Sequence, residues 1–287
     1  MNSMTEYKGI LIPIGGNEDK GQHENNGLDF IEEGILSHIV NQSGGVDAKI
    51  VVIPTASSIP VEVGQNYLNA FQHLGCNNVE VLDIRDRQVA EDPNTLKTIS
   101  KADCVMFSGG NQSNITKVIG GTTLHELLLN RFKNEEFVIA GTSAGAMAMA
   151  TEMVAGGSSS EAMLKGAVKM KKGLGLIPQL IIDTHFIRRG RFGRLVEAVA
   201  THPKLIGIGL AEDTGLIIKN GNEFQVIGSG MVILFDPSSV THNAHELLKP
   251  GTAMSISNLT THILANGDRF KLDNRNITVL PIREAFV

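Results

Sequence analysis

The first two-thirds of the chain alternate short apolar runs with amphipathic stretches, and this alternation constrains the fold more than any other feature. Five runs rich in valine and isoleucine are typical of buried strands, at residues 9–14, 49–54, 79–84, 103–108 and 137–141. The stretches between them have helical spacing, at residues 28–40, 60–74, 111–119, 123–134 and 143–154. The sequence therefore predicts an α/β fold with a mostly parallel central sheet and helices on both faces.

After about residue 205 the pattern changes to strand-like runs joined by short links, at 206–210, 215–219, 223–228 and 231–235. Asn220-Gly221 is a strong hairpin signal, and Asn266-Gly267 indicates a second hairpin. We therefore expect antiparallel hairpins in the C-terminal third that extend the same sheet. Because no Pro- or Ser-rich linker, low-complexity tract or repeat interrupts the chain, we expect a single α/β domain over residues 1–287.

Composition excludes several classes of protein. The formal net charge of −5 lacks the basic excess of a sequence-independent nucleic-acid binder. Two cysteines cannot form a disulfide framework, and their spacing does not suit zinc. Residues 1–8 lack the apolar core of a signal peptide, and no apolar run is long enough to span a bilayer. We expect a cytoplasmic protein that binds neither membranes nor nucleic acid.

A buried run ends at Gly141, and Gly141-Thr142-Ser143-Ala144-Gly145 fits the G-x-S-x-G nucleophile elbow. The glycines relieve crowding in a very sharp turn. Ser143 would then project at a helix N-terminus, where the Ala144 N–H can help hold an oxyanion. A tight turn with Ser143 as an ordinary helix cap fits the same five letters.

A serine nucleophile also needs a base and an acid that orients the base. Of nine histidines, His185 lies just past an apolar run, where open α/β sheets place their sites. Glu212 and Asp213 directly follow another apolar run, and either is a candidate to orient His185. The plainer alternatives are a hydrogen-bonded histidine at a strand end and a solvated acidic turn. The order Ser143, His185, acid differs from that of α/β-hydrolases, so the motif does not imply their fold.

Two glycine-containing loops also follow predicted strands. Gly110, in the loop after the fourth strand, is a candidate second oxyanion donor, and Gln112 a candidate substrate contact. That loop has neither G-x-G-x-x-G nor a Walker lysine, which argues against a nucleotide site. In the loop after the first strand, Glu18 is either a ligand or a plain loop acid.

Arginines crowd one segment directly after His185, at Arg188, Arg189, Arg191 and Arg194. A charge cluster usually forms a solvated face. Next to a candidate base it favours a second interpretation, in which guanidinium groups clamp the carboxylates of an acidic substrate.

Five segments in one order resemble the cyanophycinases, serine exopeptidases related to peptidase E: GGNEDKG at 15–21, FSGGNQ at 107–112, GTSAGAMAM at 141–149, DTHFIRRGRFGRL at 183–195 and GIGLAEDTG at 207–215. The resemblance implies a class I glutamine-amidotransferase-like fold. It further implies Ser143 as nucleophile, His185 as general base and then acid, Glu212 as orienting acid, and the Gly110 and Ala144 N–H groups as oxyanion hole.

The resemblance also implies a substrate and a set of contacts to it. Cyanophycin is a polyaspartate with arginine on each side-chain carboxyl, and the family cleaves it to β-aspartyl-arginine dipeptides without metal or cofactor, commonly as a homodimer. The implied contacts are Gln112, Asp183, Thr184, Arg189, Arg191 and Arg194. From their charge, Glu18 and Asp183 can also pair with the guanidinium groups of such a polymer.

Two positions depart from the family pattern: Thr184 stands where glutamine is often found, and Asn17 where alanine is common. The first would weaken one substrate hydrogen bond. Two other functions stay open on the sequence alone. One is a peptidase E-like hydrolase of aspartyl or isoaspartyl dipeptides, and the other is a catalytically silent binding protein on the same fold.

Overall fold

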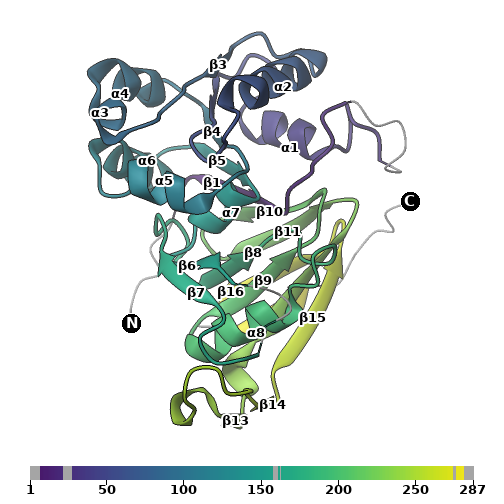
Figure 1. Cartoon of the computed structure of the whole chain (residues 1–287). Helices are drawn as coiled ribbons and strands as arrows, with labels where there is room; N and C mark the ends of the chain where they lie inside the picture. The colour runs from purple at the N-terminus through teal and green to yellow at the C-terminus, as the bar shows by residue number, and fades with distance from the viewer. Residues whose placement is uncertain (1–6, 22–27, 158–160, 162, 274–275, 281–287) are drawn as a thin grey trace.

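The computed structural model describes residues 7–21, 28–157, 161, 163–273 and 276–280 (Figure 1). A nine-stranded sheet has the order β17-β16-β11-β10-β1-β5-β4-β2-β3. Its parallel half comprises β1 (Ile10–Ile14), β2 (Ile50–Ile53), β3 (Val79–Val81), β4 (Cys104–Phe107) and β5 (Val138–Thr142). Its antiparallel half comprises β10 (Thr214–Lys219), β11 (Glu223–Gly228), β16 (Arg269–Asp273) and β17 (Asn276–Leu280).

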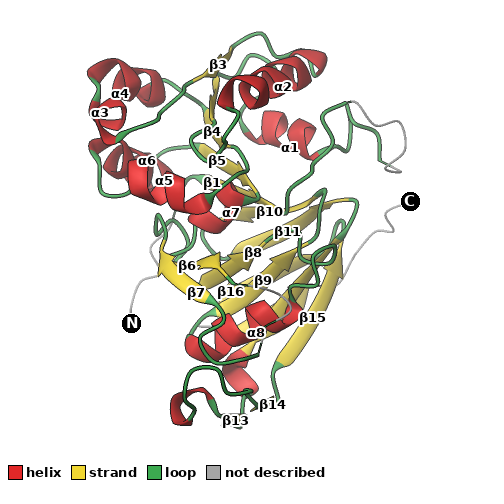
Figure 2. Cartoon of the chain, viewed as in Figure 1, coloured by secondary structure: helices red, strands yellow, loops and turns green. Residues whose placement is uncertain are grey.

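Four of the parallel strands, β1, β2, β4 and β5, are buried on both faces, as the apolar runs predict, and β3 is a partly exposed edge strand. Leu11 and Val51 point to one hydrophobic cluster, and the adjacent Ile12 and Val52 point to the other. The second cluster is covered by α1 (Ile35–Gln42) and α2 (Pro60–His73). The first is covered by α3 (Arg87–Glu91), α4 (Pro93–Ser100), α5 (Gln112–Val118), α6 (Thr123–Asn134) and α7 (Ala144–Ala148), and Figure 2 shows the two sets on opposite sides of these strands.

A second, four-stranded sheet has the order β15-β12-β9-β8, with β8 (Leu180–Asp183), β9 (Ile206–Leu210), β12 (Met231–Asp236) and β15 (Thr260–Ala265). Helix α8 (Phe192–Thr201) packs on it so closely that a Cβ on Gly207 would lie 2.6 Å from Val199. The first hydrophobic cluster runs through both sheets and joins them. Smaller elements are the β6 (Glu152–Gly156)–β7 (Lys169–Lys172) and β13 (His242–Asn243)–β14 (Ile256–Ser257) ribbons and the 3₁₀ turns η1 (Pro237–Ser239) and η2 (His245–Leu247).

The α/β class and the mostly parallel sheet with antiparallel hairpins are confirmed, and two of the predicted helices differ in extent. The helix expected over 28–40 begins at Ile35, and the one expected over 143–154 ends at Ala148. Residues 152–156 form strand β6 instead, because Met153 and Val154 bury their side chains in the core from an extended ribbon. The predicted lack of a signal-peptide core concerns residues 1–8. Residues 1–6 of this stretch lie outside the described residues.

The C-terminal third extends the central sheet only in part. Asn220 and Gly221 form the predicted β10–β11 hairpin, with φ of 55° and 72°. Asn266-Gly267 instead connects β15 of the small sheet to β16 of the large one, so the second predicted hairpin is wrong. Runs 206–210 and 231–235 likewise pair in the second sheet, since an apolar run does not specify which strand it will pair with. Within the described ranges, no helix combines the length and apolarity needed to cross a lipid bilayer.

Candidate active site

The carboxyl ends of strands from both sheets meet at one place in the molecule. In the loop after β1, Gly15 O accepts a hydrogen bond of 2.8 Å from the N–H of His185, which lies just past β8. The next residue in this loop does the same: Gly16 O accepts a hydrogen bond of 2.9 Å from the N–H of Asp213, which lies just past β9. The end of β5 adjoins it too, because Ser143 N donates to Ile14 O. This junction places the candidate residues beside one another, as expected for open α/β sheets.

Ser143 occupies a strained turn between β5 and α7, with φ of 50° and ψ of −105°. A Cβ on Gly145 would lie 2.6 Å from the carbonyl oxygen of Phe107, and one on Gly141 would lie 2.7 Å from the Gly145 backbone. Only glycine fits at these two positions, which is the steric requirement of a nucleophile elbow. The Ser143 side chain makes no capping hydrogen bond, so the interpretation of Ser143 as an ordinary helix cap is wrong.

Ser143, His185 and Glu212 form a chain of short contacts. The Ser143 Oγ lies 3.0 Å from His185 Nε2, and His185 Nδ1 lies 2.6 Å from Glu212 Oε1. Asp213 does not take part in this chain, because its carboxylate accepts from Asp19 N at 3.1 Å and from the Ser229 hydroxyl at 2.6 Å. Of the two acids that the sequence left open, Glu212 is therefore the one in contact with the imidazole.

Burial and neighbouring charges set the protonation of this chain. Burial lowers the pKa of His185; the hydrogen bond to Glu212 opposes this, and the positive charges of Arg189 and Arg191 add to the lowering. Burial raises the pKa of Glu212, but hydrogen bonds from His185 and Arg188 outweigh it and hold that pKa below its ordinary value. The favoured state is a neutral imidazole beside an ionised carboxylate, which suits a general base.

The two candidate oxyanion donors lie on either side of Ser143. A Cβ on Gly109 would lie 3.4 Å from the Ser143 Cβ, so the loop that carries Gly110 borders the hydroxyl. Ala144 is the first residue of α7, where a backbone N–H has no partner within the helix. Among the described residues, neither the Gly110 nor the Ala144 N–H has an acceptor.

Four of the expected substrate contacts are buried in the structure. Asp183 and Thr184 are fully buried. Arg194 is buried and donates through Nε to Asp183 Oδ2 at 2.8 Å, while its Nη2 bonds the other oxygen. Glu18 is also buried, with its carboxylate bonded to Tyr67, Thr142 and Lys20. In this structure these side chains hold strand ends together.

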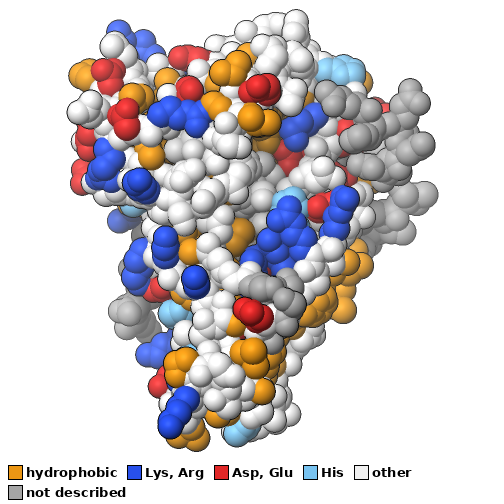
Figure 3. Space-filling view, in the orientation of Figure 1, with side chains coloured by type: hydrophobic (Ala, Val, Ile, Leu, Met, Phe, Trp, Pro, Cys, Tyr) orange, Lys and Arg blue, Asp and Glu red, His pale blue; other side chains and the backbone are white. Residues whose placement is uncertain are grey.

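The remaining expected contacts lie nearer the surface. Arg189 is exposed, and Arg191 is partly exposed although it donates to Asp183 and to Thr184 O. Gln112 is partly exposed and donates to Val154 O at 2.8 Å. The space-filling view shows Lys and Arg side chains gathered at mid-height beside a histidine (Figure 3).

Comparison with known proteins places the chain in a family. The model of peptidase family S51 matches residues 26–227. Curated cyanophycinases from Trichormus variabilis and Nostoc sp. are each 38% identical over 281 residues, covering 98% of this chain and 91% of theirs. The chain belongs to peptidase family S51. A third cyanophycinase, from Geminocystis herdmanii, is 35% identical over 93% of this chain and 95% of its own.

Two solved structures share the fold of this chain at lower identity. A peptidase from an acI-B1 Actinobacterium matches with a TM-score of 0.62 and 20% identity, over 93% of this chain and 98% of that one. A putative peptidase E protein from Listeria monocytogenes matches with a TM-score of 0.51 and 18% identity, over 76% and 98%. As an S51 member, the chain is a serine-type peptidase.

Sequence reasoning missed two contacts of the S51 site. Arg188 Nη1 lies 2.8 Å from Glu212 Oε2, the carboxylate oxygen that does not face His185. Asn17 Nδ2 lies 3.5 Å from the same oxygen. The position of Arg188 three residues after His185 was a signal for the first contact. Nothing in the sequence indicated the second, since Asn17 and Glu212 are 195 positions apart.

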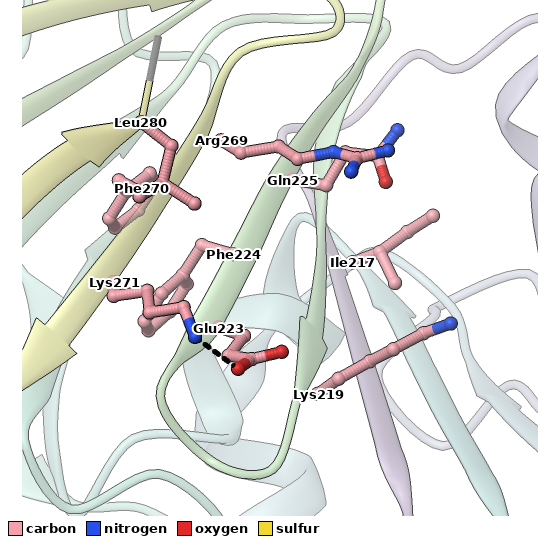
Figure 4. Close-up of a pocket in the computed structure, with 9 residues that line it drawn as sticks. All are labelled: Ile217, Lys219, Glu223, Phe224, Gln225, Arg269, Phe270, Lys271 and Leu280. Carbon is pink, nitrogen blue, oxygen red and sulfur yellow. Dashed lines mark hydrogen bonds and ion pairs between the residues drawn. The ribbon is translucent and has the colours of Figure 1, made fainter.

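A pocket of about 260 Å³ lies elsewhere, on one face of β10, β11, β16 and β17 (Figure 4). Its lining includes Lys219 at the end of β10, whereas Glu212 precedes the start of that strand. Its Glu223 and Lys271 are paired with each other at 2.6 Å. This pocket is therefore separate from the Ser143 site. In the described part of the chain, no group of three or more His, Cys, Asp or Glu side chains is arranged to hold a metal ion.

Proposed function

We propose that this S51 peptidase hydrolyses cyanophycin and releases β-aspartyl-arginine dipeptides through an acyl-enzyme on Ser143. The observation that carries the proposal is the continuous chain from the Ser143 hydroxyl through His185 to Glu212, with contacts of 3.0 and 2.6 Å. The choice of substrate is supported by the cyanophycinase relatives, which are 38% identical across 98% of this chain.

In the proposed mechanism His185 Nε2 takes the Ser143 proton as the Oγ attacks the scissile carbonyl carbon. The negative charge that develops on the carbonyl oxygen is held by the Gly110 and Ala144 N–H groups. His185 then gives its proton to the leaving amine as the peptide bond breaks. Water, deprotonated by His185, attacks the acyl carbon and restores the Ser143 hydroxyl. Glu212 stabilises the imidazolium that forms in each half-reaction.

Arg189 and Arg191 are the arginines that we propose to bind carboxylates of the polymer. The Arg189 N–H donates to His185 O at 3.0 Å, and Arg191 Nη1 donates to Thr184 O at 2.7 Å, so both arginines are held beside the proposed base. Guanidinium groups bind carboxylates bidentately, which orients a branched acidic chain as well as attracting it. For Asp183, Thr184, Arg194 and Glu18 we propose supporting roles, because protein groups already occupy their polar atoms.

We also propose that the enzyme acts in the cytoplasm as a homodimer, without a metal or cofactor. A reducing compartment is consistent with its cysteines, since Cys76 and Cys104 are both buried and unpaired. Burial raises the pKa of Cys104 to about 12, so its thiol is unreactive. Sedimentation velocity of the purified chain tests the dimer.

Product analysis tests the substrate. Purified enzyme incubated with cyanophycin is expected to release β-aspartyl-arginine, identified by mass spectrometry, while α-aspartyl and isoaspartyl dipeptides are left uncleaved. Cleavage of those dipeptides with cyanophycin left intact would contradict the proposal and identify a peptidase E-like dipeptidase. Cleavage of neither substrate would contradict both functions.

The pH dependence of kcat/KM tests the role of His185. A general base works only when neutral, and activity is lost as the pH falls through the pKa of the imidazole. Burial together with Arg189 and Arg191 lowers that pKa below its ordinary value of 6.5. We therefore expect the acid limb of kcat/KM to have its midpoint below pH 6.5. A midpoint above that value would contradict the assignment of His185 as a base that is held neutral.

A further inference from the structure

The segment after β1 contacts the backbone beside each of the three proposed catalytic residues. Three consecutive carbonyl oxygens accept hydrogen bonds from three different strand ends: Ile14 from Ser143 at 2.9 Å, Gly15 from His185 at 2.8 Å, and Gly16 from Asp213 at 2.9 Å. Ser143 follows β5 of the large sheet, His185 follows β8 of the small sheet, and Asp213 lies between β9 of the small sheet and β10 of the large one. One short segment therefore links strand ends of both sheets.

The next two residues continue the pattern through their side chains. Asn17 Nδ2 lies 3.5 Å from Glu212 Oε2. Glu18 Oε2 accepts from the Thr142 hydroxyl at 2.5 Å, immediately before Ser143. The Glu18 side chain is only 1% exposed and its pKa is lowered: burial raises it, but Lys20 and hydrogen bonds from Thr142 and Tyr67 outweigh burial. It is thus an ionised buried anchor for the end of β5.

Gly16 lies directly against the catalytic face of the imidazole. A Cβ at this position would lie 2.5 Å from both Cε1 and Nε2 of His185, and Nε2 is the atom that faces Ser143. A methyl group there cannot coexist with the present position of the ring. The absence of a side chain at Gly16 therefore permits the 3.0 Å contact between His185 and Ser143.

We propose that residues 14–18 are the positioning segment that aligns Ser143, His185 and Glu212, with Gly16 setting the position of the imidazole. The inference rests on the proposed function in one respect, namely that the three side chains act together. Ser143 follows β5 and Glu212 precedes β10, which both pair with β1 in the large sheet, whereas His185 follows β8 of the small sheet, so pairing within one sheet does not fix the position of the imidazole. Displacing one reacting group by about 1 Å typically costs on the order of 100-fold in rate.

Gly16→Ala tests the inference, with Gly45→Ala as a matched control. The two glycines have nearly the same φ, 99° and 96°, which L side chains rarely adopt, so both variants carry strain from a positive φ. Nothing lies within 4 Å of a Cβ at Gly45. We expect Gly16→Ala to lower kcat by about 100-fold with KM changed less than about twofold. Gly45→Ala is expected to keep the kcat of the unmodified enzyme, and equal losses in both variants would overturn the proposal.

A second variant covers the case in which Gly16→Ala does not fold. Asn17→Asp keeps the size of an exposed side chain and tolerates its φ of 53°. It adds a negative charge beside Glu212, which favours the imidazolium form of His185 and raises its pKa. We expect the acid limb of kcat/KM to move upward by about half a pH unit. An unchanged pH profile would contradict the proposal that this segment acts on the Glu212–His185 pair.

A substrate-independent readout separates this inference from the proposed function. A fluorophosphonate probe reacts with an activated serine by displacement of fluoride, and its rate of reaction at Ser143 reports alignment alone. Slow labelling of Gly16→Ala beside fast labelling of Gly45→Ala supports the positioning segment even if cyanophycin is not cleaved. Equal labelling rates would overturn it even if cyanophycin is the substrate.

Discussion

Replacement of Ser143 by alanine is expected to lower kcat for cyanophycin by about a millionfold, because the proposed nucleophile and its partners act as one unit. The fold is expected to be unaffected. The Ser143 hydroxyl caps no helix, and its hydrogen bond in the structure is to His185. Steady-state hydrolysis at saturating substrate measures the first effect, and the thermal midpoint Tm measures the second.

Ser100→Ala is the control for this substitution. The Ser100 hydroxyl is exposed at the end of α4 and bonds only to the Lys97 carbonyl of its own helix. Its loss should leave kcat unchanged. If Ser143→Ala retained the kcat of the unmodified enzyme, the assignment of the nucleophile would be wrong. The alternative of a catalytically silent binding protein predicts no hydrolysis by any variant, including the unmodified chain.

Replacement of Arg194 by alanine is expected to lower the free energy of unfolding by about 3–5 kcal/mol. The Asp183 carboxylate is fully buried, and Arg194 bonds both of its oxygens. Without Arg194 the carboxylate would keep two bonds, both to Oδ1, from Arg191 at 3.1 Å and from the Thr184 N–H at 2.8 Å, and Oδ2 would lose its bond to Arg194. A buried charge that loses its main partner retains the cost of leaving water, so the loss exceeds that of an ordinary ion pair.

Urea unfolding measures this effect, and Lys172→Ala is its control. Lys172 pairs with Glu152 on the β6–β7 ribbon, but its side chain is 75% exposed. Exposed pairs contribute at most about 1 kcal/mol, so the control should differ little from the unmodified protein. Equal stability of the two variants would contradict a supporting role for Arg194. Arg194 would then be assigned to the substrate contacts, as the family resemblance implies.

Much of the central fold was predictable because its determinants are local in the sequence. The four inner strands of the parallel half, β1, β2, β4 and β5, lie in short apolar runs, and such runs are typical of strands buried on both faces. The elbow was predictable because its five-residue motif is contiguous, and the contact that requires Gly141 lies within the turn, although Gly145 is required by a distant neighbour, Phe107. His185 was selected among nine histidines because it follows a strand, and strand ends meet at one edge.

Several features that sequence reasoning missed depend on partners that the local sequence does not specify. The run at 206–210 pairs with β8 and β12 in a second sheet, and its composition does not indicate this choice. Asp183 and Glu18 were expected to face substrate because they are acidic and near a site. Their burial follows from Arg194, Tyr67 and Thr142, and a charge pattern does not show which partner an acid will take.

Mass-spectrometric mapping of a fluorophosphonate adduct is the most direct test of the proposed catalytic chain. In the unmodified protein the adduct is expected on Ser143, and in His185→Gln its formation should be slowed by orders of magnitude, because the hydroxyl loses its base. An adduct on another residue, or equally fast labelling of Ser143 without the imidazole, would contradict the account.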